Sequence, residues 1–287
     1  MQSFLNMKDV IISDTKHLNN KIKEIAKQGK KKIHVVADFD RTLTTAFVQG
    51  KKVPSLISIL RDGNYLSEDY ANKAHELFNY YHAIEINPSV PIEEKKKLMK
   101  EWWMKHFDLL IKSRLNRKDI QKVIESGKAR LRKGAVQFLD FLHEHDIPLV
   151  IFSSSGLGVD SISLYLEKKK KLYKNIHIIS NVYEWDENGN AIKVKEPIIH
   201  CMNKDETSIQ DYPVFSVIKN RRNVILLGDS FEDLGMVKGF KYDNLIAIGF
   251  LNEEIDENLE AYKKTFDIVI TRDGDMNYVN DLFKKLI

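Results

Sequence analysis

The chain has 287 residues, of which 43% are hydrophobic and 30% charged, with a formal net charge of +4. This length allows a large core and a second, smaller unit. The charge is mild and the lysine runs are short, which argues against a nucleic-acid partner. The single cysteine, Cys201, excludes an internal disulfide and a thiolate metal cluster.

No apolar run in the chain approaches the ~18 residues that span a membrane. Residues 1–32 have the pattern of an amphipathic helix, without the continuous apolar stretch of a secretory signal. We therefore expect a cytoplasmic protein without membrane contact, and we favour a monomer.

Short apolar runs rich in β-branched residues predict buried strands at residues 33–37, 148–152, 176–180, 224–227, 245–248 and 268–271. Helical patterns separate most of them, at residues 135–145, 159–170, 214–220, 234–238 and 258–266. This alternation predicts a Rossmann-like, doubly wound parallel sheet of the α/β class. Residues 187–190 (ENGN) predict the turn of a small hairpin.

One long segment breaks the alternation of strands and helices. After the first strand, the chain shows no strand-like run until the helix at residue 135. Helical patterns cover residues 67–81 and 92–111, and a weaker one covers residues 116–127. We predict a helical cap at residues 49–130, inserted into an α/β core formed by residues 1–48 and 131–287.

Two strands run directly into acidic residues. Asp38 and Asp40 follow the first strand, and Asp229 and Asp233 follow the strand at 224–227. Ligands of open α/β sheets bind outside the carboxyl ends of the strands. Carboxylates gathered there repel one another unless a cation is present, and Mg²⁺ suits carboxylates combined with a phosphate. Taken alone, Asp233 also suits a helix N-cap.

Two further segments suit a phosphate group. The strand at 148–152 ends in Ser153, Ser154 and Ser155 before Gly156, which places hydroxyls and backbone N–H groups at a helix start. Taken alone, this is ordinary turn chemistry. Lys204 follows a short apolar segment and supplies a cation, although a single lysine is more often a surface residue.

Together these motifs resemble the haloacid dehalogenase-like phosphohydrolase superfamily: DxDxT at 38–42, Ser153, Lys204 and GDSxxD at 228–233. Three stretches narrow the resemblance to the cytosolic 5′-nucleotidase III (pyrimidine 5′-nucleotidase) family. They are DFDRTLT at 38–44, YYHAIEINP at 80–88 continuing to EWW at 101–103, and IIH with NK at 198–204.

The resemblance implies an Mg²⁺-dependent hydrolase of nucleoside 5′-monophosphates, probable substrates being CMP or UMP. Asp38 would be the nucleophile and Asp40 the general acid and base. Asp38, Asp229 and the Asp40 backbone carbonyl would hold the metal, with Asp233 supporting its shell.

The resemblance also implies how the substrate is bound. Ser153, Ser154 and Lys204 would hold the phosphate, while Glu85 and Trp103 would contact the base. This chain departs from the family at FSSSG, where FSAG is usual, and at His106, which replaces a substrate-side serine. The first departure leaves open which of Ser153 and Ser154 does what, and the second leaves the base preference open.

The mechanism expected is attack by Asp38 on phosphorus, protonation of the leaving alkoxide by Asp40, and hydrolysis of the aspartyl phosphate. Three alternatives remain open. They are a phosphatase for another small phosphomonoester such as phosphoserine or a sugar phosphate, a phosphotransferase, and a non-catalytic phosphate-binding protein.

Overall fold

The computed structural model describes residues 9–205 and 209–287. Its centre is a seven-stranded sheet in the order β1-β11-β10-β9-β2-β5-β6, in which β1 is antiparallel to β11 and the other pairs are parallel. The strands of this sheet are β1 (Val10–Ile12), β2 (Ile33–Ala37), β5 (Leu149–Phe152), β6 (Ile176–Ile179), β9 (Asn223–Gly228), β10 (Asn244–Leu251) and β11 (Ile268–Thr271). The predicted α/β class with a mostly parallel sheet is confirmed.

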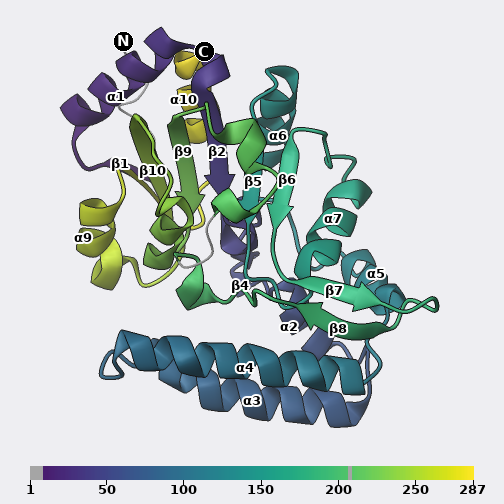
Figure 1. Ribbon diagram of the computed structural model, residues 1–287. Helices are drawn as coiled ribbons and strands as arrows, with labels where there is room; N and C mark the ends of the chain where they lie inside the picture. Colours follow the sequence, from purple (N-terminus) through teal and green to yellow (C-terminus); the bar gives the residue numbers. More distant parts are fainter. Residues whose placement is uncertain (1–8, 206–208) are drawn as a thin grey trace.

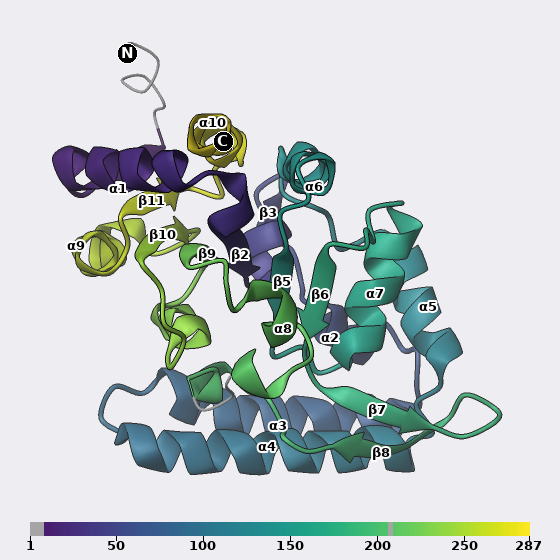
Figure 2. The ribbon, with the colours of Figure 1, turned by 45° about the horizontal axis from the view of Figure 1, so that its top comes forward.

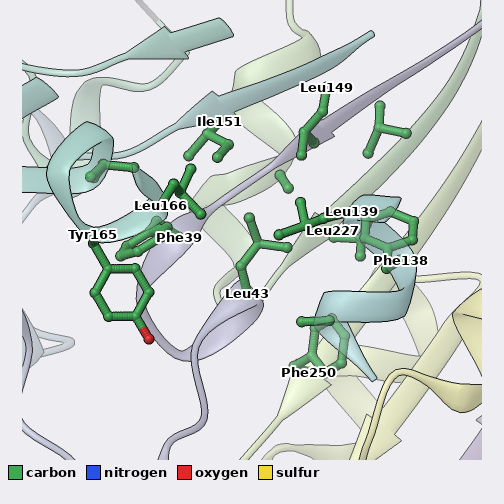
Figure 3. Packing of buried hydrophobic residues seen from close by; sticks show 14 of the residues in the cluster. Phe39, Leu43, Phe138, Leu139, Leu149, Ile151, Tyr165, Leu166, Leu227 and Phe250 are labelled. Carbon is green, nitrogen blue, oxygen red and sulfur yellow. The ribbon is translucent and has the colours of Figure 1, made fainter. Parts of the chain in front are cut away.

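Helices cover both faces of the sheet. The central strands β2, β5 and β9 are therefore buried on both sides. In β9, Ile225 and Leu227 join one hydrophobic cluster while Val224 and Leu226 join the other. Figure 3 shows part of the first cluster. The helices that cover the first face of the sheet are α1 (Thr15–Gln28), α6 (Ala135–Glu144), α7 (Gly158–Lys168) and α10 (Asn277–Leu286). The second face is covered by α8 (Phe215–Ile218), the 3₁₀ segment Phe231–Val237 and α9 (Ile255–Thr265).

A helical layer lies across the carboxyl edge of the sheet (Figures 1 and 2). The chain enters it through the small hairpin of β3 (Phe47–Val48) and β4 (Lys51–Lys52), followed by α2 (Leu56–Asp62), α3 (Glu68–Ile86) and α4 (Ile92–Lys112). The hydroxyl of Ser67 caps α3 by accepting from the backbone N–H of Tyr70, 3.2 Å away. Because this helical layer lies across the carboxyl edge of the sheet, the cap domain faces the strand ends that carry the acidic motifs.

The last helix of the inserted segment, α5 (Arg117–Glu125), packs against both α2 and α7. It begins with a capping box: Asn116 accepts from the backbone N–H of Lys118, and Asp119 accepts from the backbone N–H of Asn116. In the described part of the chain, no helix is long and apolar enough to cross a membrane. The domain limits near residues 49 and 130 stay a prediction.

Most predicted elements are present, with some differences. The turn at residues 187–190 joins β7 (Val182–Trp185) to β8 (Ala191–Lys195), which confirms the hairpin. The helix predicted at 234–238 is the end of the 3₁₀ segment. Residues 1–8 of the expected N-terminal helix lie outside the described residues, and the rest of that segment forms strand β1 before helix α1.

Candidate active site

Three adjacent strands bring three of the sequence motifs to one edge of the sheet. Ala37 of β2 pairs in register with Leu227 of β9 on one side and Ile151 of β5 on the other. The backbone N–H of Asp38 donates to Leu227 O at 3.0 Å. Asp38, Asp229 and Ser153 therefore follow strands that end at the same level, where ligands of such sheets bind.

Lys204 joins two of these motifs directly. Its Nζ donates to Asp38 Oδ1 at 2.7 Å and to Asp233 Oδ1 at 2.6 Å. All three side chains are buried. Burial alone would lower the pKa of Lys204, but the carboxylates of Asp233 and Asp38 outweigh it and raise that pKa above its usual value. Lys204 is therefore a fixed positive charge beside Asp38.

Asp233 holds the loop that follows β9. Its Oδ2 accepts from the backbone N–H groups of Asp229 and Ser230, at 2.9 and 3.0 Å. A Cβ on Gly228 would lie 2.5 Å from the Asp233 side chain, so glycine is needed for this close approach. Asp233 thus completes the capping box at the start of the 3₁₀ segment, whose N-cap is Ser230, and is also the partner of Lys204.

The carboxylates at this edge suit a divalent cation. Burial raises the pKa of Asp38 to about 7, and burial together with Asp233 and Asp38 raises the pKa of Asp229 well above its usual value. Within residues 9–205 and 209–287, no three His, Cys, Asp or Glu side chains form a metal-binding group by themselves. Mg²⁺ does not require one, because it binds through one or two carboxylates plus phosphate and water. The oxygen-only donor set, with Asp38 buried and Asp40 and Asp229 half-buried, therefore fits this ion.

The loop after Asp38 brings Asp40 and Thr42 to the same place. Asp40 has φ −69° and ψ 131°, and Arg41 is left-handed with φ 58°. Thr42 Oγ1 donates to Asp229 Oδ1 at 3.4 Å, which links the first and last motifs. Burial raises the pKa of Asp40 to about 6, so a share of this carboxyl is protonated near neutral pH.

The serine motif lies beside this loop at the end of β5. The Ser155 hydroxyl is engaged within its own turn, 3.3 Å from Ser161 Oγ and accepting from the backbone N–H of Leu157. Ser153 is buried and Ser154 half-buried. Ser153 and Ser154 are therefore the two hydroxyls of the motif left for a phosphate.

A cavity of about 1100 Å³ opens between the cap and the core. Arg41 and Ser230, neighbours of the acidic motifs, line it on the core side, and Glu85 of α3 lines it on the cap side. Glu85 Oε2 lies 2.8 Å from His82 Nδ1, and its Oε1 accepts from Cys201 Sγ at 2.8 Å. The structure thus places the predicted base-contacting glutamate on the cavity that adjoins the strand ends.

Trp103 lines a smaller cavity of about 140 Å³. Phe78 and Arg61 line both cavities, so the two adjoin. The smaller one also contains His106, whose Nε2 lies 3.2 Å from the Tyr70 hydroxyl. Burial lowers the pKa of His106 to about 4, so this imidazole is neutral at pH 7. The predicted glutamate and tryptophan therefore do not share one cavity but line two adjoining ones.

Two residues that the sequence did not single out, Arg132 and Tyr262, also contact the motifs. Arg132 donates to the backbone carbonyl oxygens of Arg41 and Thr42, and Tyr262 Oη donates to Asp229 O at 2.5 Å. Cys201 packs against the hydrophobic cluster of Tyr81, Met99 and Trp102 and also contacts Glu85. These are contacts between distant segments, and no local pattern marks them.

The chain matches the model of the family described as pyrimidine 5′-nucleotidase (UMPH-1) over residues 41–287. A similar curated relative, from Xenopus laevis, is the 7-methylguanosine phosphate-specific 5′-nucleotidase A. It is 34% identical over 279 residues, which cover 96% of each chain.

Solved structures agree with this match. Cytosolic 5′-nucleotidase IIIB bound to cytidine superposes with a TM-score of 0.87 at 27% identity, covering 98% of this chain and 95% of the other. A phosphoserine phosphatase, described as a phospho-aspartyl intermediate analogue, has a TM-score of 0.51 at 16% identity, with 88% and 98% covered, and supports the fold alone. The chain therefore belongs to the pyrimidine 5′-nucleotidase (UMPH-1) family and is a 5′-nucleotidase.

Proposed function

We propose that the chain hydrolyses nucleoside 5′-monophosphates with Asp38 as the nucleophile. The observation that carries this proposal is the meeting of Asp38, Asp229 and Lys204 at the carboxyl ends of adjacent strands, beside a cavity of about 1100 Å³. A carboxylate held next to a fixed lysine charge suits attack on a phosphate ester, because the cation offsets charge on the phosphoryl oxygens.

The reaction has two displacements. Asp38 Oδ forms a bond to phosphorus while the bond to the ester oxygen breaks, and Asp40 gives its proton to that oxygen. A water molecule then attacks the aspartyl phosphate, Asp40 takes the water's proton, and inorganic phosphate leaves Asp38 as a free carboxylate. The raised pKa of Asp40, about 6, supports this double role.

A magnesium ion would be held by Asp38, Asp229 and the backbone carbonyl of Asp40, with Asp233 orienting the loop. When bound, it offsets negative charge on the transferring phosphoryl group. Ser153, Ser154 and Lys204 would hold the phosphate oxygens. Ser153 and Ser154 follow β5, the strand next to that of Asp38, which supports this assignment.

For the base we propose contacts from Glu85 and Trp103, which line the two adjoining cavities. A carboxylate accepts from an exocyclic amino group, as it does from cytosine N4. The family description names pyrimidine nucleotides, the frog relative is named for 7-methylguanosine phosphate, and the solved relative holds cytidine. Cytosine and 7-methylguanine carry such an amino group, whereas uracil does not. We propose CMP ahead of UMP, and 7-methylguanosine phosphate as a second candidate substrate.

The test is a phosphate-release screen with and without Mg²⁺. The substrates are CMP, UMP, AMP, 7-methylguanosine phosphate, phosphoserine, a sugar phosphate and p-nitrophenyl phosphate. We expect Mg²⁺-dependent release that is fastest with CMP or 7-methylguanosine phosphate. Faster release from phosphoserine or the sugar phosphate would contradict the nucleotide proposal. Adding a nucleoside acceptor to the same assay detects phosphotransfer.

A further inference from the structure

Arg132 is a fully buried arginine that binds the loop carrying Asp40. Only 1% of its surface is exposed. Its Nε donates to Thr42 O at 2.8 Å, its Nη2 donates to Arg41 O, and its Nη1 donates to Gly274 O at 2.8 Å. A rigid guanidinium that reaches several carbonyl oxygens at once fixes their relative positions in a way that a lysine cannot.

The loop needs this support because Arg41 has a left-handed backbone, with φ 58°. For a residue with a side chain, this conformation costs about 1 kcal/mol or more and persists only where contacts enforce it. Asn252 adds to them: its Nδ2 donates to Arg41 O at 3.1 Å, and its Oδ1 accepts from Arg132 Nη2 at 3.0 Å. The carbonyl oxygen of Arg41, the residue after Asp40, therefore accepts hydrogen bonds from both Arg132 and Asn252.

The ion-pair partner of Arg132 holds a different segment. Asp273 lies 2.9 Å from Arg132 Nη1. Its carboxylate also accepts from the backbone N–H groups of Ala46 and Phe47, at 2.8 and 2.9 Å, and from the hydroxyl of Thr45. These residues form the first connection from core to cap.

The second connection between core and cap runs alongside the first. The backbone N–H of Thr45 donates to Arg130 O at 3.0 Å, and that of Arg132 donates to Leu43 O at 2.9 Å. The Arg132–Asp273 pair thus lies where both connections meet the loop that follows β2. The polar contacts of the pair tie three segments together: residues 41–47, 130–132 and 272–274.

We propose that Arg132 and Asp273 are positioning residues, Arg132 for the carboxyl of Asp40 and Asp273 for the cap. The inference rests on the proposed function, since it assumes that Asp40 moves protons and that the cap binds the base. Neither residue touches the substrate. Arg132 acts through the carbonyl oxygens beside Asp40, and Asp273 acts through the backbone of the first connection.

The test compares kcat and KM of the Mg²⁺-loaded full chain on two substrates, its best nucleotide and p-nitrophenyl phosphate, which has no base. Arg132→Lys keeps the charge but loses the fork of donors. We expect kcat to fall about 10- to 100-fold on both substrates with KM nearly unchanged, because a misplaced proton donor slows the chemistry of either one.

Asp273→Asn should instead change KM more than kcat, and mainly for the nucleotide. We expect KM for the nucleotide to rise about tenfold, with a much smaller change for p-nitrophenyl phosphate, because loss of a charged hydrogen-bond acceptor loosens the cap. The matched control is Asp267→Asn. Asp267 also pairs with a cation, Lys21, and accepts from a backbone N–H, that of Ala247, but it lies before β11 at the opposite edge of the sheet.

A purely structural role would reduce activity in all three variants, the Asp267→Asn control included, in step with the melting temperature. Arg132→Lys and Asp273→Asn would then not differ in whether kcat or nucleotide KM changes, and that result would overturn the inference. If Arg132→Lys does not fold, Asn252→Ala removes one of the two donors to Arg41 O and should lower kcat about threefold or more on both substrates. Wild-type kcat in Asn252→Ala would then overturn it. Absence of phosphatase activity in the wild-type chain would instead refute the proposed function.

Discussion

At the scale of single residues, Lys204 decides the electrostatics of the candidate site. It is buried with two carboxylates at 2.6 and 2.7 Å, so removing the lysine would leave two buried carboxylates without their cation. Asp38 and Asp233 lie on different motifs, and the lysine holds them together. This arrangement explains why an isolated lysine in a chain with 45 basic residues belongs to the site.

The first expectation concerns Asp38→Asn. Without a carboxylate to form the acyl phosphate, phosphate release should fall at least about 10³-fold, since covalent catalysis loses its nucleophile. Lys204 keeps Asp233 as a partner, so the melting temperature should change little. Phosphate-release kinetics and thermal unfolding check both points. Asp140→Asn, which removes a distant surface ion pair with Lys171, is the control and should stay active.

A second expectation separates base recognition from chemistry. Glu85→Ala should raise KM for the best nucleotide about tenfold or more and leave p-nitrophenyl phosphate nearly unchanged, because only the nucleotide presents an amino group. Glu101→Ala is the control: Glu101 lies on α4 and binds Tyr81 and Lys105 away from the main cavity. Equal rises of KM on both substrates in Glu85→Ala would remove Glu85 from the base site.

At the scale of elements, the turn between β5 and α7 depends on one glycine. Gly158 has φ +64°, and a Cβ there would lie 2.2 Å from Asn181 O. Gly158→Ala should therefore lower the free energy of unfolding by about 2 kcal/mol or more, from left-handed strain plus a backbone clash. Gly127→Ala, at φ +66° with open space around the Cβ, should cost only about 1 kcal/mol. Urea unfolding measures both, and equal losses would show that the clash is relieved.

The predicted strands and motifs were readable because each is a local pattern. Buried parallel strands form continuous apolar runs, and the carboxylates follow them directly, as Asp38 follows β2. Strand β1 was missed because it has three residues and exists through pairing with β11. Arg132 and Asp273 were missed because their partners are distant in sequence, and the separation of Glu85 and Trp103 into two cavities depends on helix packing.

At the scale of the whole molecule, the core and cap divide the work. The core presents the acidic motifs and the serine motif at one edge of the sheet, and the helices of the cap lie across that edge (Figure 2). Glu85 of the cap lines the cavity between the two. Substrate choice therefore depends on side chains far in sequence from the chemistry. The chain shares its family with relatives that are described with different bases: pyrimidines, 7-methylguanosine phosphate and cytidine.

Stability of the whole fold should depend on pH through His34 of β2. His34 is buried, with Nδ1 2.6 Å from Arg221 O, and burial lowers its pKa to about 4 from 6.5. As pH falls below 6.5 the unfolded chain takes up a proton that the folded one does not, so stability is lost between pH 6.5 and 4.

His34→Gln removes this contribution. Between pH 7.5 and 5, its free energy of unfolding should fall by about 2 kcal/mol less than that of the wild type. Urea unfolding at both pH values measures the difference, and exposed His17→Gln is the control. Identical pH slopes in wild type and His34→Gln would mean that His34 does not resist protonation in the folded state.

The central claim is that Asp38 carries the phosphoryl group during turnover. The most direct measurement is rapid acid quenching of the Mg²⁺-loaded chain with its best nucleotide, followed by peptide mass spectrometry. We expect one phosphate on the peptide containing Asp38, formed within the first turnover and absent from Asp38→Asn. Turnover by the wild type with no phosphorylated Asp38 at any quench time, together with an active Asp38→Asn variant, would contradict the account.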